Sequence, residues 1–247
     1  MEQFAGERAA LRGEAAHHLG RVLRAEPGQV CELSDGESLW LGRVERVGRD
    51  AVEFALLEQL PAQGPKLQVT LALAIVKFDR FEWSLEKATE LGAAEIVPLA
   101  AARSEKALVA AAAKRADRWR KILMESAQQS RRMRPPILKD AAKALDYFGR
   151  LPAATTAVCK ERESNTGEEC RLLLSERPET RSIKQVLDGC GAASCVLAIG
   201  PEGGWTEEEF AAARAAGFEE ASLGGNILRT ETAVVAALAS VNFALAE

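Results

Sequence analysis

Short apolar runs, turn residues and helical stretches follow one another along the chain, and their arrangement changes once. Before residue 60, three short strand candidates are separated by the turn residues 34–37 and 48–50, which predicts a small β barrel. Beyond residue 66, strand candidates alternate with helical stretches, as in an α/β sheet. The strand candidates are residues 30–33, 39–47, 51–57, 67–76, 95–99, 156–158, 171–174 and 195–199.

The change of pattern falls at residues 60–66, where Pro61, Gly64 and Pro65 interrupt it. We therefore expect a first domain over residues 1–65 and a second over residues 66–247. A chain of this length can bury a core without disulfides or metals.

The clearest local pattern surrounds residues 195–199, a continuous apolar run that predicts a strand buried on both faces of a sheet. Thr206 and Glu209 follow at the spacing of a capping box, in which side chains satisfy the first free amides of a helix. That helix is expected to turn Phe210 inward and to end at Gly217. The predicted order is strand, glycine-rich segment and capped helix.

A similar order recurs nearer the C-terminus. Residues 221–223 form a short strand candidate, Gly224 and Gly225 let a ligand approach the backbone closely, and Thr230 is expected to cap a helix that runs to Leu245. Because this helix is apolar on nearly every side, we expect it to be buried inside the domain or at a subunit interface.

Two segments therefore lie between a strand and a helix: residues 199–205, the first glycine segment, and residues 223–232, the second glycine segment. Side by side, their backbone amides could hold a small ligand. Neither segment has the Gly-Lys-Ser/Thr ending of a phosphate-binding loop or the three spaced glycines of a dinucleotide site. Glu202 would also repel a phosphate, so an uncharged or cationic ligand fits better.

The amino-acid sequences of the two segments resemble those of a known family. Gly-Pro-Glu-Gly-Gly at residues 200–204, followed by Leu-Gly-Gly-Asn-Ile-Leu-Arg-Thr-Glu-Thr-Ala at residues 223–233, resembles the RsmE family of ribosomal RNA small subunit methyltransferases. This family belongs to the SPOUT class, whose cofactor site is a trefoil knot. The resemblance covers most of the chain, with further matches at residues 18–24, 87–92, 129–130 and 132.

The resemblance implies a fold and a reaction. The fold is an α/β, SPOUT-type trefoil-knotted parallel sheet, preceded by a small PUA-like β-barrel domain that binds RNA. The reaction is methyl transfer from S-adenosylmethionine to N3 of a uridine in 16S rRNA, at position 1498 in the customary numbering. The implied substrate is the 30S subunit or its rRNA, and the enzyme is expected to be a homodimer.

The resemblance also assigns roles to individual residues. RNA-binding candidates are Arg21, Arg24, Arg131 and Arg132. The cofactor-binding candidates are Leu174, Ser175, Ile199, Gly200, Pro201, Glu202, Gly203, Leu223, Gly224, Gly225, Asn226, Ile227 and Leu228.

Catalysis must expose N3 and remove its proton, because N3 lies on the pairing edge of uracil. Arg229 is the candidate that stabilises negative charge developing on the uracil carbonyl oxygens, as an oxyanion hole would. Glu231 is a candidate proton acceptor. Thr230 and Glu231 have a structural alternative, a helix cap with a carboxylate that complements the positive helix start, whereas the functional interpretation is stronger for Arg229.

Although the net charge of the chain is −4, one segment of it is strongly basic. Residues 114–134 contain eight basic residues against two acidic ones, which favours local contact with RNA phosphates. The alternative is a solvated helix face above a buried Trp119.

Five cysteines without a Cys-x-x-Cys pair indicate reduced thiols, and two adjacent histidines, His17 and His18, make a zinc site implausible. We expect no metal. We find neither an export signal nor a membrane-spanning run, so a cytoplasmic location is expected.

Two other functions stay open: a related knotted enzyme that methylates a ribose 2′-hydroxyl, and a noncatalytic RNA-binding assembly factor. The chain also has Asn226 where RsmE proteins have arginine, and Arg131 where they have glycine. These two differences leave room for a shifted target nucleotide.

Overall fold

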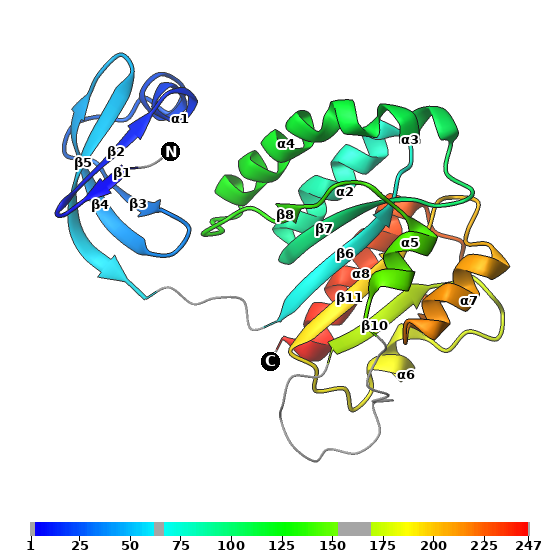
Figure 1. Ribbon diagram of the computed structural model, residues 1–247. Coiled ribbons are helices and arrows are strands. Elements are labelled where there is room, and N and C mark those ends of the chain that lie inside the picture. The colour runs from blue at the N-terminus through cyan, green and yellow to red at the C-terminus, as the bar shows by residue number, and fades with distance from the viewer. Residues whose placement is uncertain (1–2, 62–66, 153–168, 247) are drawn as a thin grey trace. The chain divides into compact units, whose positions relative to one another are not determined.

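The structure is a computed structural model that describes residues 3–61, 67–152 and 169–246 (Figure 1). The chain divides into two compact units: Met1–Gly64 with Arg131–Arg134, and Pro65–Ser130 with Pro135–Glu247. The sequence did not predict that Arg131–Arg134 would group with the first unit. Within that unit, the hydroxyl of Ser34 donates a hydrogen bond to the carbonyl of Met133 at 3.2 Å.

The first unit is an antiparallel sheet with the strand order β1-β2-β5-β4-β3. The three strands predicted in this part of the chain are confirmed as β3, β4 and β5, while β1 and β2 were not predicted. Among the described residues, β1 and β3 are the two edge strands of this sheet and do not pair with each other. Pairing of β1 with β3 therefore does not close the sheet into the expected barrel. Its elements are β1 (Gln3–Ala5), β2 (Arg8–Arg12), α1 (Glu14–His17), a π-helix (His18–Val22), β3 (Val30–Ser34), β4 (Leu39–Val47) and β5 (Ala51–Leu60).

One face of this sheet forms a small core. Val44, Val52 and Phe54 are almost completely buried, and Leu33 packs beside them. A Cβ at Gly42 would lie 2.4 Å from Cδ1 of Leu33, so any larger residue here would require the Leu33 side chain to shift.

The second unit contains a parallel sheet with the order β12-β10-β11-β6-β7-β8, and β9 also pairs with β7. Its strands are β6 (Gln68–Ala74), β7 (Ala93–Ala100), β8 (Ile137–Leu138), β9 (Ala142–Lys143), β10 (Glu169–Leu174), β11 (Ser194–Ile199) and β12 (Glu219–Ala221). Four predicted strands are confirmed as β6, β7, β10 and β11. The one predicted at 156–158 lies outside the described residues, and the one at 221–223 is wrong by two residues.

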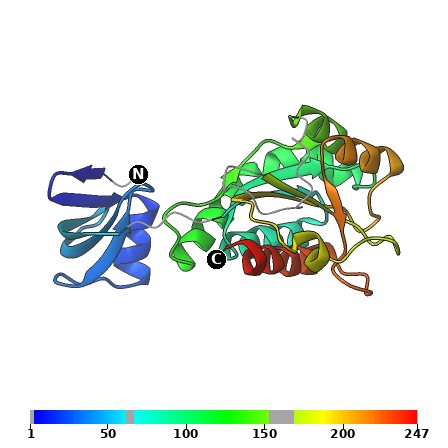
Figure 2. The ribbon, with the colours of Figure 1, turned by 90° about the horizontal axis from the view of Figure 1, so that it is seen from below.

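Helices cover both faces of this sheet (Figures 1 and 2). Helices α2, α4, α6 and α8 share one hydrophobic core with it, and α5 and α7 share the other. The predicted α/β class is thereby confirmed. The helices are α2 (Phe78–Glu90), α3 (Lys106–Ala112), a 3-10 turn (Ala113–Arg115), α4 (Ala116–Gln129), α5 (Ala144–Arg150), α6 (Ile183–Leu187), α7 (Glu207–Ala215) and α8 (Thr230–Leu245).

The strand β11 contributes to both cores, as its continuous apolar sequence predicted. Leu197 and Ile199 face the core with α2 and α8, whereas Val196 and Ala198 face the core with α5 and α7. Because side chains alternate along a strand, a strand covered on both faces must be apolar throughout.

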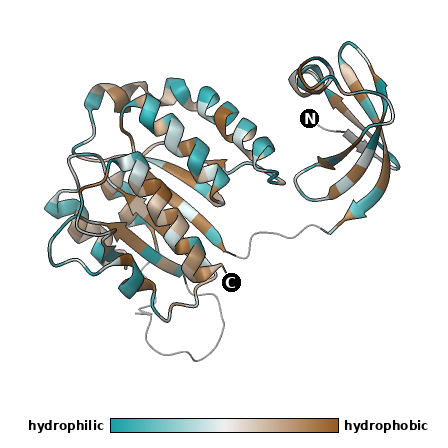
Figure 3. Ribbon diagram, turned by 180° about the vertical axis from the view of Figure 1, so that it is seen from behind, coloured by the Kyte–Doolittle hydropathy of each residue, from teal (hydrophilic) through white to brown (hydrophobic). Residues whose placement is uncertain are grey.

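Helix α8 is buried along only one stripe, formed by Val234, Ala237, Leu238 and Val241. It packs against α2, α6 and β11, and Asn242 donates a hydrogen bond to the carbonyl of Leu91 at 2.7 Å. Its remaining surface is also largely apolar, and the side of α8 visible in Figure 3 has few hydrophilic positions. In the described parts of the chain, no helix combines the length and the apolar character needed to cross a membrane.

Candidate functional site

The ends of three neighbouring strands surround a cavity of about 490 Å³ in the second unit. β12, β10 and β11 are adjacent and parallel, so their carboxyl ends at Ala221, Leu174 and Ile199 lie at one edge of the sheet. Ligands in open α/β folds bind at this kind of edge. Both glycine segments contribute to the wall.

Every residue that the sequence assigned to cofactor binding lines this cavity. The set comprises Leu174, Ser175, Ile199, Gly200, Pro201, Glu202, Gly203, Leu223, Gly224, Gly225, Asn226, Ile227 and Leu228. Their convergence is an observation, whereas their role in binding stays a prediction. Arg103, Arg177 and Phe210 line it as well and were not predicted.

The first glycine segment is held by the buried indole of Trp205. Its Nε1 donates a hydrogen bond to the carbonyl of Leu174 at 3.2 Å, which joins the segment to the end of β10. A Cβ at Gly200 would lie 3.0 Å from this indole, so glycine allows the close packing. At Gly204 the backbone turns with a φ of 68°, and its amide donates to the carbonyl of Pro201.

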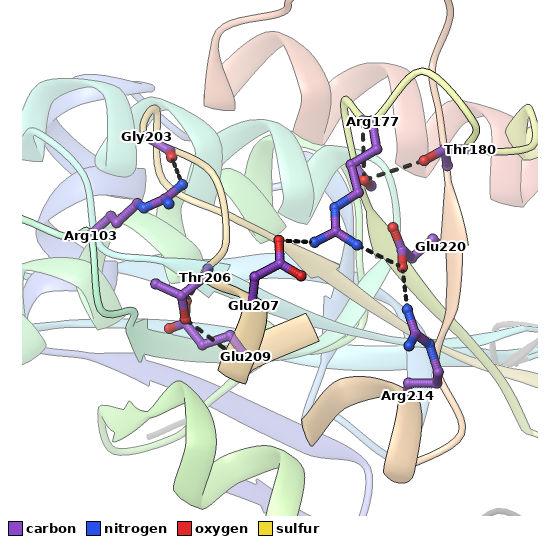
Figure 4. A network of polar contacts seen from close by, with 10 residues as sticks. Arg103, Arg177, Thr180, Gly203, Thr206, Glu207, Glu209, Arg214 and Glu220 are labelled. Carbon is purple, nitrogen blue, oxygen red and sulfur yellow. Dashed lines mark hydrogen bonds and ion pairs between the residues drawn. The ribbon is translucent and has the colours of Figure 1, made fainter. Parts of the chain in front are cut away.

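The predicted capping box after this segment is confirmed. Thr206 accepts from the amide of Glu209, and the buried carboxylate of Glu209 accepts from the amide of Thr206 at 2.9 Å. Glu209 also accepts from the amide of Ala102 at 2.8 Å, and Arg103 donates to the carbonyl of Gly203 at 2.7 Å (Figure 4). The chain after β7 is therefore bonded to the first glycine segment at Gly203 and to the first turn of α7 at Glu209.

A charged network lies beside the cavity, which two of its members, Arg177 and Glu207, line (Figure 4). The guanidinium of Arg177 lies 3.6 Å from the centre of the Phe210 ring and pairs with Glu207 and Glu220, while Arg214 lies 3.1 Å from Glu220. The hydrogen bond that Arg177 donates to the carboxylate of Glu207 raises the pKa of Arg177. These contacts tie the chain after β10 to α7.

The second glycine segment is more exposed. Just before it, Ser222 leaves the sheet and exchanges backbone hydrogen bonds with Arg181 and Ile183, which explains why β12 ends at Ala221. Gly224 has a φ of 119°, which L side chains rarely adopt. Ile227 is 80% exposed although it lines the cavity.

The structure corrects one detail at the start of α8. Thr230 is the first residue of the helix, and Arg229 occupies the cap position without a capping side-chain hydrogen bond. The hydroxyl of Thr230 instead donates to the carbonyl of Gly200 at 3.4 Å. This contact joins the two glycine segments.

The two candidate catalytic residues lie beside the cavity and do not line it. Arg229 is exposed. The carboxylate of Glu231 lies 3.8 Å from Nε of Arg80 on α2, and Arg80 also pairs with Glu202. Arg80 was not predicted, because nothing in its local sequence indicates contact with residues more than a hundred positions away.

The four candidate RNA-binding arginines all belong to the first unit. Arg21, Arg24 and Arg131 are exposed, whereas partial burial lowers the pKa of Arg132. Arg24 and Arg131 have φ values of 53° and 55°, a left-handed conformation that is uncommon for arginine. Such outliers are found disproportionately at functional sites.

The basic region on α4 is largely paired within the chain. Arg115 and Arg118 bind Glu82 at 3.3 and 2.8 Å, and Arg120 binds Asp117 at 2.8 Å. Trp119 is buried below it, as the solvated-face alternative predicted. Among the described residues there is no cluster of side chains that could hold a metal ion, and Cys31 and Cys195 are free thiols.

Comparison with known proteins defines the class first. A family model described as an RNA methyltransferase domain matches residues 63–242, and one described as an RNA methyltransferase PUA domain matches residues 11–57. The fold and the cavity thus belong to an RNA methyltransferase with a PUA domain. The chain is a member of the ribosomal RNA small subunit methyltransferase E family.

Individual relatives support this membership. Ribosomal RNA small subunit methyltransferase E of Synechocystis sp. is 32% identical over 98% of this chain and 75% of its own, and that of Bacillus subtilis is 30% identical over 95% and 89%. The crystal structure of the enzyme from Neisseria gonorrhoeae bound to S-adenosyl methionine superposes with a TM-score of 0.83, at 28% identity over 99% of this chain and 96% of that one.

Proposed function

We propose that this protein transfers a methyl group from S-adenosylmethionine to N3 of a uridine in the 16S rRNA of the small ribosomal subunit. One observation carries the proposal: the thirteen residues assigned to cofactor binding converge on one cavity at the carboxyl ends of β10, β11 and β12. Membership of the family supplies the substrate class.

The residues around the cavity suit this cofactor. A volume of about 490 Å³ lies within the range of about 300–1,000 Å³ that small-molecule sites occupy. Glycines at several lining positions expose backbone amides and carbonyls, and Glu202 suits a ligand that carries positive charge. When bound, S-adenosylmethionine supplies a methyl group on a sulfonium, which is activated for transfer.

The chain's own part in the reaction is to align the uridine and to stabilise charge. Arg229 lies in the second glycine segment, directly after the wall residue Leu228. It is also at the positively polarised start of α8. There its guanidinium would stabilise negative charge on the uracil carbonyls as the N3 proton leaves. Glu231 remains the candidate acceptor of that proton, and its Oε2 has no hydrogen-bond partner within the described residues.

We assign the RNA-binding role to the domain of residues 1–65 together with Arg131–Arg134, which group with it, and catalysis to the rest of residues 66–247. The exposed arginines Arg21, Arg24 and Arg131 would contact rRNA phosphates, and such contacts position a protein without reading sequence. The substrate is the assembled 30S subunit in the cytoplasm.

We also propose that the second unit contains the trefoil knot of the SPOUT class and forms a homodimer. The Thr230 to Gly200 hydrogen bond supports a path in which α8 begins against the first glycine segment. The apolar surface of α8 that this chain leaves uncovered supports the dimer.

Methyl incorporation tests the proposal. The full-length protein is incubated with S-adenosylmethionine labelled in the methyl group and with either 30S subunits or naked 16S rRNA from cells lacking the modification. We expect incorporation of close to one methyl group per 30S subunit and less into naked rRNA. No incorporation into either substrate, or no cofactor binding by calorimetry, would overturn the proposal.

A further inference from the structure

Arg80 lies outside the cavity, yet its guanidinium contacts both glycine segments. Nη1 pairs with the carboxylate of Glu202 in the first segment, and Nε lies 3.8 Å from Oε1 of Glu231 in the second. The side chains of Arg80 and Glu231 are only 24% and 16% exposed. Ion pairs that are shielded from water are screened less by salt than surface pairs are.

The position of Arg80 is itself fixed. It belongs to α2, whose residues Phe81 and Leu85 are completely buried in the core that α2 shares with α4 and α8. The hydroxyl of Ser84 donates to the carbonyl of Arg80 at 2.8 Å. A helix packed in the core therefore presents one guanidinium to two glycine-rich segments.

The charges around Arg80 do not balance. One guanidinium faces two carboxylates, and Oε2 of Glu231 is buried without a hydrogen-bond partner in the described part of the chain. Buried polar atoms are rarely left unpaired in native proteins. A local excess of negative charge beside the cavity also suits a cationic ligand.

We propose that Arg80 is a positioning residue of the methyltransferase site. By holding Glu202 and Glu231 together, it fixes the first glycine segment against the start of α8 and so fixes Arg229, two residues before Glu231, relative to the bound cofactor. The inference rests on the proposed function. Arg80 acts through the two carboxylates and does not touch the reacting atoms.

Arginine suits this task better than lysine does. A guanidinium offers several N–H donors in a fixed planar fork, so Nη1 and Nε can serve two carboxylates at once. A lysine ammonium keeps the charge without the fork. Arg80→Lys is therefore expected to retain part of the effect.

The test compares Arg80→Met and Arg80→Lys with a matched control, Lys139→Met. Lys139 pairs with Glu95 at 3.1 Å in the same unit but away from the cavity. Cofactor affinity is measured by calorimetry, kcat and KM with 30S subunits, and folding by thermal melting. We expect Arg80→Met to lower kcat about 10- to 100-fold, the range for loss of a charged hydrogen bond, and Arg80→Lys to lower it less. The control should match the unaltered protein.

A double-mutant cycle separates positioning from a merely structural role. Glu202→Gln is made alone and with Arg80→Met. If Arg80 acts through this carboxylate, Glu202→Gln lowers kcat much less once Arg80 is absent.

Methyl transfer by the unaltered protein is measured first. Its absence would overturn the proposed function and this inference together. If the unaltered protein is active, the inference alone fails when Arg80→Met has the kcat of the control, or when the effects in the cycle are additive. If Arg80→Met does not fold, the kcat of Arg80→Lys is compared with that of the control instead. An equal kcat contradicts the inference.

Discussion

At the scale of single residues, Arg229 is the side chain on which the proposed chemistry depends most directly. It is exposed at the start of α8 and makes no capping hydrogen bond, so its removal should leave the fold intact. Arg229→Ala should therefore bind S-adenosylmethionine nearly as well as the unaltered protein but lose about 10²- to 10³-fold in kcat, as loss of an oxyanion-stabilising donor does. Calorimetry and turnover with 30S subunits measure both quantities. Normal turnover would remove Arg229 from the mechanism.

Gly200 is the glycine with the least room near the cavity. A Cβ there would lie 3.0 Å from Cε2 and Nε1 of the buried Trp205. Gly200→Ala should displace the indole, weaken its hydrogen bond to Leu174, lower cofactor affinity and reduce the free energy of unfolding by about 1–3 kcal/mol.

Gly149→Ala is the matched control, because a Cβ at Gly149 on α5 meets nothing within 4 Å. Urea unfolding and calorimetry compare the two variants. Equal stability and equal affinity would show that the site accommodates the methyl group.

Residues in the two motifs could be placed at the site from the sequence, since both motifs are local and directly follow recognisable strands. Arg80, Arg103 and Arg177 could not be placed at the site from the sequence. Each comes from another part of the chain and reaches the site only through the packing of α2, the chain after β7 or the chain after β10. Thr230 was misassigned for the same reason, because its partner Gly200 is distant in sequence.

At the scale of elements, the sequence predicted best where local signals agree. The apolar run of β11 and the capping box of α7 determined both elements within about one residue. The strands β1, β8 and β9 have only two or three residues and depend on their pairing partners, so the sequence shows no comparable signal for them. The end of β12 is likewise set by the contacts of Ser222 with Arg181 and Ile183.

Glu209 should be the most important side chain in the first turn of α7. Its carboxylate accepts from the amides of Thr206 and Ala102 and is almost fully buried. Glu209→Ala leaves both donors without this partner, and the free energy of unfolding should fall by about 1–3 kcal/mol. Glu208 lies in the same turn but is exposed, so Glu208→Ala should change the free energy of unfolding by only about a few tenths of a kcal/mol. Urea denaturation distinguishes these results, and equal effects would refute the role of Glu209.

At the scale of the whole molecule, the uncovered surface of α8 should form the dimer interface. Phe243 is 87% exposed near the end of this helix, whose uncovered surface is largely apolar, and contiguous exposed apolar surface marks interaction sites. Light scattering should find the unaltered protein to be a dimer and Phe243→Asp to be largely monomeric. A monomeric unaltered protein would contradict the proposed dimer.

Contact with rRNA should depend on the first unit. Arg21→Ala with Arg24→Gly removes two exposed guanidiniums, and glycine also relieves the left-handed backbone at residue 24. We expect a higher KM for 30S subunits, weaker salt dependence of binding, and unchanged cofactor affinity. Arg46→Ala, an exposed arginine of the same unit paired with Glu53, is the control. Equal KM values for both variants would place the RNA contact elsewhere.

The position of the transferred methyl group distinguishes methylation of uridine N3 from methylation of a ribose. 16S rRNA is isolated from 30S subunits after reaction with the protein and S-adenosylmethionine, digested to nucleosides and analysed by mass spectrometry. We expect 3-methyluridine, with its amount reduced in parallel with kcat for Arg229→Ala. A methyl group on a ribose 2′-hydroxyl, or no methylated nucleoside at all, would contradict this expectation.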